Sequence, residues 1–143
     1  MRFGVRGHDV PASDPVDLCR KLNAMGIREL QLVAHKSFPD FCYNEDSIRQ
    51  LAAVFSEYNI HIAVYGCYID PLSEEGQARF LEHIRYAAML GADVIATETA
   101  EYNTHQQDDE EAYQRLVSVF RRWVSEAEQA GVRVAVETVY AHP

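Results

Sequence analysis

The chain has 143 residues, 48% of them hydrophobic and 24% charged, which is typical of one ordinary globular domain. Its formal net charge of −9 favours solubility and argues against nucleic acid or an anionic membrane as a partner. No apolar run reaches about 18 residues, so we expect no membrane span, and the N-terminal segment does not resemble a signal peptide. The three cysteines lack metal-type spacing, which predicts reduced thiols in a cytoplasmic protein.

The first predicted elements are a strand over residues 3–8 and a helix that begins after Asp14. Asp14 is a suitable N-cap, and Pro15 fits the first helical position. Later helices carry apolar residues at helical spacing, and one of them has Ser73 as its expected cap. Four amphipathic helices are therefore expected, with these apolar residues in chain order: Leu18, Leu22 and Met25; Ile48, Leu51, Ala52 and Phe55; Leu81, Ile84 and Ala88; Leu116, Phe120, Trp123, Ala127 and Ala130.

A short sequence pattern recurs where each of these helices gives way to the next strand. Each helix ends at a Gly or Asn, which suits the left-handed residue that terminates a helix, and a short apolar strand comes next. The pattern occurs at Gly26, Asn59, Gly91 and Gly131. It predicts further strands over residues 29–34, 61–65, 93–97 and 133–138.

Strict alternation of strands and helices indicates a parallel sheet with right-handed crossovers. Either an open doubly wound sheet or a barrel is compatible with that order. Five strands at roughly 29 residues per unit would extend to about 230 residues for eight units, near the usual size of a (β/α)8 barrel. The first strand is not followed by a Gly-rich phosphate loop, which weakens the dinucleotide-binding alternative. We therefore predict an α/β fold of the TIM-barrel type, with only its first five strands and four helices present in a single domain, residues 1–143.

Alternation of side chains within the strands predicts which residues face the barrel axis. Val132, Val134 and Val136 suit the interface between sheet and helices, so the opposite parity faces inward. Applied to every strand, this parity places polar residues near the strand ends, at the rim where parallel barrels hold their active sites. Two carboxylates and two histidines there could bind a divalent metal or transfer protons. The convergent set is Arg6, His8, Gln31, His35, Tyr65, Glu98 and Glu137.

Three segments resemble the sugar phosphate isomerase/epimerase family, the xylose isomerase-like barrels that also include the type IV apurinic endonucleases. Residues 65–72 resemble the exit of the family's third strand, and residues 92–100 resemble its Thr-Glu-Thr-Gly segment, with Ala100 where Gly is common. Residues 134–142 resemble the strand that supplies a metal-binding Glu. The endonuclease branch carries histidines on its third and fourth strands. Here the strand-three position corresponds to Cys67 or Tyr68 and the strand-four position to Glu98, which disfavours that branch.

The resemblance implies that the chain is the N-terminal part of a metal-dependent sugar or keto-sugar isomerase or epimerase. Glu137 would bind a divalent metal (Mn, Mg, Co or Zn) and act in catalysis with Glu98, while the metal would not be fully coordinated by this chain. The expected ligand is a small sugar or sugar phosphate. Residues expected to contact its oxygens are Arg6, His8, Gln31, His35, Tyr65 and His142.

Three hypotheses about function remain open at this point. The first is the isomerase or epimerase, whose fragment would be inactive alone. The second is a polyol dehydratase that uses the same carboxylate to remove a proton and expel water. The third is a non-catalytic half-barrel that works by association, since an open sheet exposes two strand edges and an uncovered inner face; we expect such a chain to self-associate or form homo-oligomers.

Overall fold

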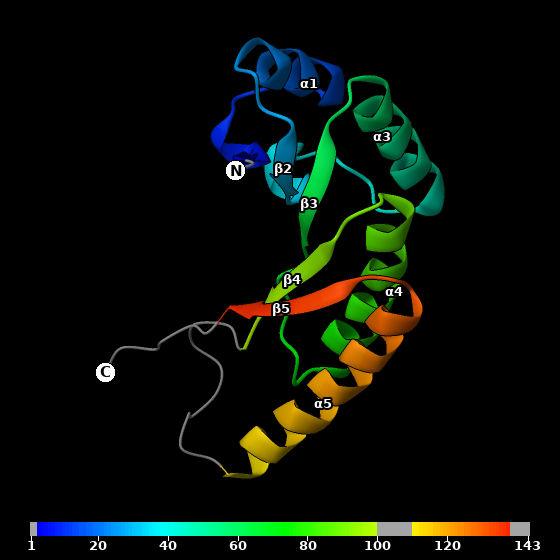
Figure 1. Ribbon diagram of the computed structural model, residues 1–143. Helices are drawn as coiled ribbons and strands as arrows, with labels where there is room; N and C mark the ends of the chain where they lie inside the picture. Colours follow the sequence, from blue (N-terminus) through cyan, green and yellow to red (C-terminus); the bar gives the residue numbers. More distant parts are fainter. Residues whose placement is uncertain (1–2, 100–109, 138–143) are drawn as a thin grey trace, which may run out of the picture.

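A computed structural model describes residues 3–99 and 110–137 and shows a curved, five-stranded parallel sheet (Figure 1). The strands lie in chain order, and each pairs in parallel with the next. Helices follow the strands along one face of the sheet (Figure 1). This confirms the predicted fold class, an α/β half-barrel. The strands are β1 (Gly4–Arg6), β2 (Glu29–Leu32), β3 (His61–Gly66), β4 (Val94–Glu98) and β5 (Arg133–Glu137).

Four long helices cover the outer face of the sheet, as the apolar periodicity predicts. The structure also contains two short helical elements after strands, which the sequence analysis does not predict. Residues 3–99 and 110–137 contain no helix that could span a lipid bilayer. The long helices are α1 (Pro15–Ala24), α3 (Glu45–Glu57), α4 (Glu74–Met89) and α5 (Glu110–Gln129), and the additional elements are the 3-10 helix η1 (Gly7–Asp9) and helix α2 (Ala34–Ser37).

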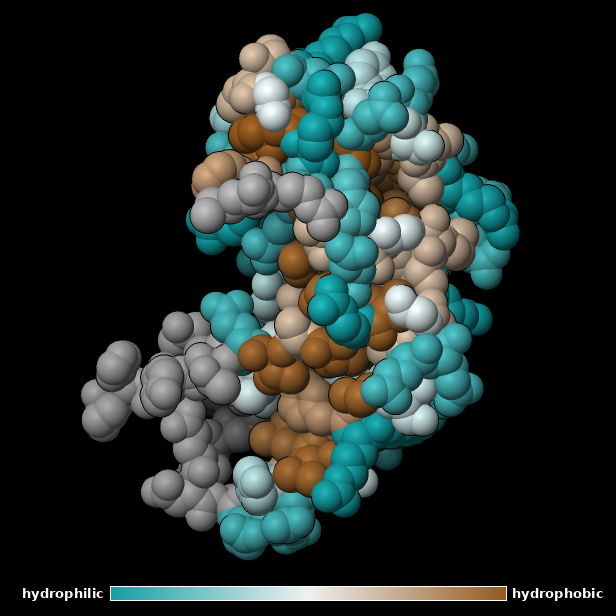
Figure 2. Space-filling model, viewed as in Figure 1, coloured by the Kyte–Doolittle hydropathy of each residue, from teal (hydrophilic) through white to brown (hydrophobic). Residues whose placement is uncertain are grey.

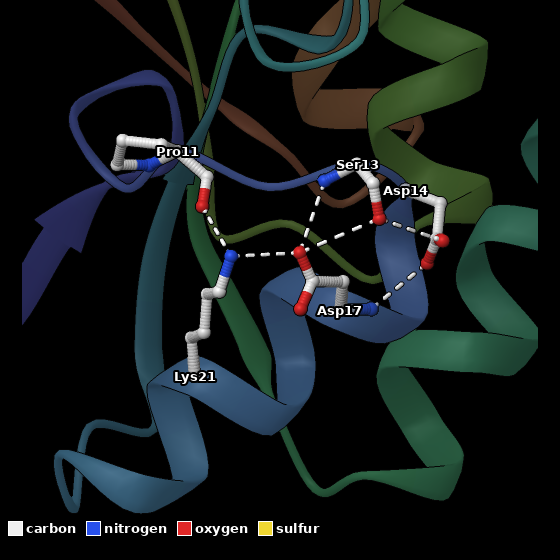
Figure 3. A network of polar contacts seen from close by, with 5 residues as sticks. All are labelled: Pro11, Ser13, Asp14, Asp17 and Lys21. Atoms are coloured by element: carbon white, nitrogen blue, oxygen red, sulfur yellow. Dashed lines mark hydrogen bonds and ion pairs between the residues drawn. The ribbon is translucent and has the colours of Figure 1, made fainter.

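Side-chain caps fix where the helices begin. The Asp14 carboxylate accepts a hydrogen bond from the Asp17 N–H at 2.8 Å, and Pro15 occupies the first turn, as expected. Lys21 donates to both the Pro11 carbonyl and the Asp17 carboxylate, which ties the incoming loop to α1 (Figure 3). Ser73 caps α4 by accepting from the Gly76 N–H, which confirms its predicted role.

The helices also end where the recurring Gly or Asn pattern in the sequence predicts. Gly26, Asn59, Gly91 and Gly131 have φ values of 71°, 54°, 66° and 75°, in the left-handed region. An asparagine tolerates this conformation better than most side chains, and glycine adopts it without a Cβ penalty. The chain can therefore reverse from each helix into the next parallel strand.

The hydrophobic core lies between the sheet and the long helices. Leu30, Ile62 and Ile95 each have at most 2% of their surface exposed, and they project from three neighbouring strands toward the helices. Trp123 of α5 is fully buried and stacks on Phe80 of α4, with ring centroids 4.0 Å apart. This packed outer layer leaves the opposite face of the sheet to form the site.

Candidate functional site

Polar side chains from the strand ends and the loops after them meet in a hollow of about 410 Å³ on the inner face of the sheet. Five of the seven lining residues belong to the set that strand alternation predicts. Parallel strands place their C-terminal ends at one rim, so residues distant in sequence converge there. The lining residues are Arg6, His8, Gln31, Lys36, Tyr68, Glu98 and Glu137.

The acidic side of the hollow consists of Glu98 and Glu137. These residues are register partners at the ends of β4 and β5, so their backbones lie one strand spacing apart, about 4.8 Å. Glu98 is half-buried and Glu137 is exposed. Two neighbouring carboxylates can share a proton or bind a hard cation.

The basic side comes from β1, η1 and α2. Arg6 donates from Nε to the Asp9 carboxylate at 2.7 Å. His8 Nε2 lies 4.0 Å from the same carboxylate group, while its buried Nδ1 has no hydrogen-bond partner among residues 3–99 and 110–137. Lys36 completes this side from helix α2.

Gln31 and Tyr68 lie between the two charged sides. Gln31 Nε2 donates to the Tyr68 hydroxyl at 3.2 Å, and the Lys36 ammonium lies 5.3 Å from the centre of the Tyr68 ring. Burial raises the pKa of Tyr68, and the nearby carboxylates of Glu137 and, more weakly, Glu98 raise it further. The phenol therefore stays protonated and can donate to a ligand oxygen.

The predicted inward orientation of Tyr65 is wrong, because β3 contains a bulge. Leu30 pairs with Ile62, but the next residue, Gln31, pairs with Val64, so one residue of β3 is skipped. After the bulge, Tyr65 faces the helices: it is fully buried, and its hydroxyl lies 2.9 Å from His83 Nδ1 in α4.

The same shift sends Cys67 to the core and turns Gly66 toward the inner face. Cys67 is 4% exposed, and burial raises the pKa of its thiol to about 12, so it stays a neutral thiol at neutral pH. A Cβ at Gly66 would come 2.6 Å from Val33 Cγ2 and 2.9 Å from the Tyr68 ring. Only glycine fits against these two side chains. Tyr68, and not Tyr65, lines the hollow.

His35 and His142 do not join the described hollow. The predicted second strand ends early, at Leu32, and His35 lies in the short helix α2. There its Nδ1 lies 3.1 Å from the Tyr43 hydroxyl, which also accepts from the His35 backbone N–H. Burial lowers the pKa of His35, which favours the neutral ring. His142 lies outside the described residues, and its expected role stays a prediction.

Two residues of the hollow, Lys36 and Tyr68, are absent from the set that strand alternation predicts. Tyr68 belongs to the segment that follows the third strand, but Ile62 and Val64 continue a regular alternation in the sequence, so nothing there reveals the bulge. Lys36 lies in a turn of helix that begins where the sequence predicts a longer strand. Both omissions arise from local backbone geometry at the strand exits.

The described residues fit only part of a metal shell. Within residues 3–99 and 110–137, no three His, Cys, Asp or Glu side chains lie close enough together to hold a metal ion. Glu98 and Glu137 offer the oxygen donors that hard divalent cations prefer, but a complete site needs further ligands.

The model of a protein family described as xylose isomerase-like TIM barrel matches residues 19–143. The chain belongs to this family, as the three resembling segments predicted. No curated protein sequence gives a significant match.

Solved structures with the same fold include several sugar epimerases. D-psicose 3-epimerase in the presence of D-fructose superposes with a TM-score of 0.74 at 16% identity, over 95% of this chain and 52% of that one. The IOLI protein with a bound zinc atom superposes with a TM-score of 0.75 at 17% identity, over 97% of this chain and 52% of that one. The 3-keto-D-glucoside 4-epimerase YcjR from E. coli superposes with a TM-score of 0.77 at 13% identity, over 99% of this chain and 57% of that one. The chain thus spans about half the length of the structures it matches.

Proposed function

We propose that this chain forms the substrate-facing part of a metal-dependent sugar or keto-sugar isomerase or epimerase. The observation that carries the proposal is the inner hollow, where Glu98 and Glu137 lie side by side at the rim. The epimerases of the same fold support the choice of reaction. Glu137 is the proposed metal ligand of this chain, in keeping with the family segment that it occupies.

Isomerisation and epimerisation both move a proton at the carbon beside a carbonyl group. A carboxylate within reach of that carbon can accept the proton and return it, and Glu98 and Glu137 provide such groups on one side of the hollow. Gln31 and the Tyr68 hydroxyl, hydrogen-bonded to each other, are placed to orient substrate oxygens. A divalent metal, when bound, would polarise the carbonyl and a neighbouring hydroxyl.

The metal assignment is tested by titrating the 143-residue chain with Mn²⁺ and following paramagnetic broadening of backbone NMR signals. We expect weak binding that broadens signals around Glu98 and Glu137, and loss of this broadening in Glu137→Gln. Glu126→Gln, which removes an exposed carboxylate from α5, is the matched control and should leave the broadening unchanged. Broadening centred elsewhere would contradict the assignment.

The reaction is tested in D2O with a panel of ketoses. The protein that contains this chain should place deuterium at the carbon beside the carbonyl, and Glu137→Gln should abolish that exchange. The 143-residue chain alone should give no turnover with or without Mn²⁺, because its described residues do not complete a metal shell. Turnover by the chain alone would contradict the proposed incomplete site.

An apolar groove between α5 and β5 favours association as a second candidate function. The groove has a volume of about 570 Å³, and Figure 2 shows hydrophobic side chains gathered over these two elements. Val136 of β5 is 41% exposed there, although its partners Val132 and Val134 are covered more fully. Sedimentation analysis tests this candidate: concentration-dependent association that weakens in Val136→Ser supports it, and a monomer at all concentrations contradicts it.

A further inference from the structure

We propose that this chain forms a two-fold symmetric dimer, in which β5 of one copy pairs in antiparallel with β5 of a second copy. The apolar grooves between α5 and β5 of the two copies then close against each other. The inference rests on the second candidate function, association, and deepens it by naming the partner and the strand that binds it.

The two edges of the sheet differ in how well they can pair with another strand. Among the described residues, β1 and β5 are the outermost strands. β1 has three residues, and very short edge strands are one way in which proteins avoid edge pairing. β5 has five residues without a proline, and four of them are exposed. The β5 edge is therefore the one suited to a further strand.

The backbone of β5 presents its valines to the open edge. The Arg133 N–H donates to the Asp93 carbonyl at 3.1 Å, so the peptide groups of Arg133 point toward β4. Peptide groups alternate in direction along a strand, and those of Val134 and Val136 consequently point away from β4. Directly opposite residues of an antiparallel pair can exchange two backbone hydrogen bonds, and Val134 and the partner's Val136 are placed to do so.

The side chains of β5 are complementary to a second copy of the same strand. When Ala135 lies on the two-fold axis, Arg133 lies opposite the partner's Glu137, and symmetry repeats the pair on the other side. Opposite charges that face each other across two strands stabilise a sheet. On the outer face, Val134 lies beside the partner's Val136. A shift of two residues would lose both ion pairs, so charge selects this register.

The apolar groove lies next to this edge and is covered by the same arrangement. Five large hydrophobic residues of the described chain are exposed, and three of them, Tyr113, Val124 and Val136, line the groove. Val136 is one residue from the proposed axis, and directly opposite residues share a face of the joined sheet. The two grooves therefore face each other across the axis. Burial of apolar surface is the main favourable contribution to most protein association.

Sedimentation equilibrium of charge variants tests the pairing. We expect a monomer–dimer equilibrium for the 143-residue chain, and Arg133→Glu should raise the dissociation constant about tenfold, because like charges then face each other twice. The double variant Arg133→Glu/Glu137→Arg exchanges the charges and should return the constant to within about threefold of its original value. Arg122→Glu, an equal change in charge on the exposed surface of α5 outside the groove, is the control and should leave the constant unchanged. A double variant as weak as Arg133→Glu would overturn the proposal.

A cysteine on the axis tests the register. Opposite residues that do not exchange hydrogen bonds have Cα atoms about 4.5 Å apart, within the range of a disulfide. Ala135→Cys should form a covalent dimer with glutathione disulfide as oxidant, in a Cys42→Ser background that removes the exposed thiol. Gln129→Cys, exposed at the end of α5, is the control in the same background and should remain monomeric on a denaturing gel. Equal cross-linking of the two variants would overturn the register.

The outcomes also distinguish this inference from the proposed functions. A dimer that weakens in Val136→Ser, but neither responds to the charge exchange nor cross-links at residue 135, leaves association standing and overturns β5 pairing. A monomer at all concentrations contradicts both. Oligomers that grow beyond a dimer indicate a head-to-tail contact and overturn the two-fold arrangement. The metal assignment is tested separately, by Mn²⁺ broadening around Glu137 in the Arg133→Glu variant.

Discussion

The two faces of the sheet differ in polarity and in whether helices cover them. The outer face is apolar and covered, with Leu30, Ile62 and Ile95 packed under the helices. The inner face is polar and open, and its rim carries both charge signs. Tyr65 and Tyr68 show the difference most directly: they lie three residues apart, yet one serves the core and the other the hollow. The bulge in β3 decides which tyrosine can contact a ligand, so residue type alone does not identify a site residue.

The largest expected effect comes from the outer face, at Trp123. Trp123→Ala should lower the free energy of unfolding by about 3–5 kcal/mol, because it removes a fully buried ring stacked on Phe80. Val124→Ala, the adjacent position on α5 with 39% of its surface exposed, should cost clearly less. Urea unfolding of both variants measures the contrast, and equal losses would contradict the description of the outer face as the closed core.

A pH effect of similar size is expected at His83, also on the covered face. Burial, with a smaller contribution from Arg79, lowers the pKa of His83 to about 4, below its ordinary value of 6.5. The unfolded chain therefore binds a proton before the folded one, and stability should fall as pH drops from 6.5 toward 4. The loss should approach about 3 kcal/mol.

Urea titrations between pH 7 and 4 measure this loss, and His83→Gln should flatten the profile. His35, whose pKa is also lowered by burial, contributes in the same direction, so His35→Asn is the matched control. A wild-type profile as flat as that of His83→Gln would contradict the buried, neutral imidazole.

The two tyrosines give a smaller effect and the sharpest contrast. Tyr65→Phe should cost about 1–3 kcal/mol, because it leaves the buried His83 Nδ1 without its partner. Tyr68→Phe should leave stability nearly unchanged and weaken ligand binding at the hollow, since it removes a rim hydroxyl. The reverse result, a destabilising Tyr68→Phe and a Tyr65→Phe with impaired binding, would contradict the assignment of the two tyrosines to opposite faces.

The smallest effect is expected at the start of α4. Ser73→Ala removes the hydroxyl that accepts from the Gly76 N–H and should cost about 1 kcal/mol. Ser118→Ala, at an exposed position within α5, is the control and should be close to neutral. Thermal unfolding measures both, and an equal shift would show that the cap contributes nothing.

The sequence predicts the fold well because repeated local signals specify it. Glycine or asparagine after each helix, together with Asp14 and Ser73 as caps, marks helix boundaries through backbone and hydrogen-bond chemistry that acts over a few residues. Those boundaries place the strands, and strict alternation makes the sheet parallel. The unpredicted elements, η1 and α2, are short turns of helix at the strand exits, where no apolar periodicity can develop.

The candidate site is predicted only where the strands are regular. Arg6, Gln31, Glu98 and Glu137 obey simple alternation and line the hollow as expected. Tyr65 does not, because one skipped residue in β3 reverses the parity of every residue after it. Such a bulge depends on pairing with a neighbouring strand and leaves no mark in the alternation of β3 itself.

The central claim, that the polar inner face is the ligand-binding face, is tested most directly by NMR mapping of D-fructose 6-phosphate on the 143-residue chain. The account predicts shift changes at Gln31, Tyr68 and Glu98, with Tyr65 and His83 unaffected. Shifts centred on the groove between α5 and β5, or on the Tyr65–His83 pair, would contradict it.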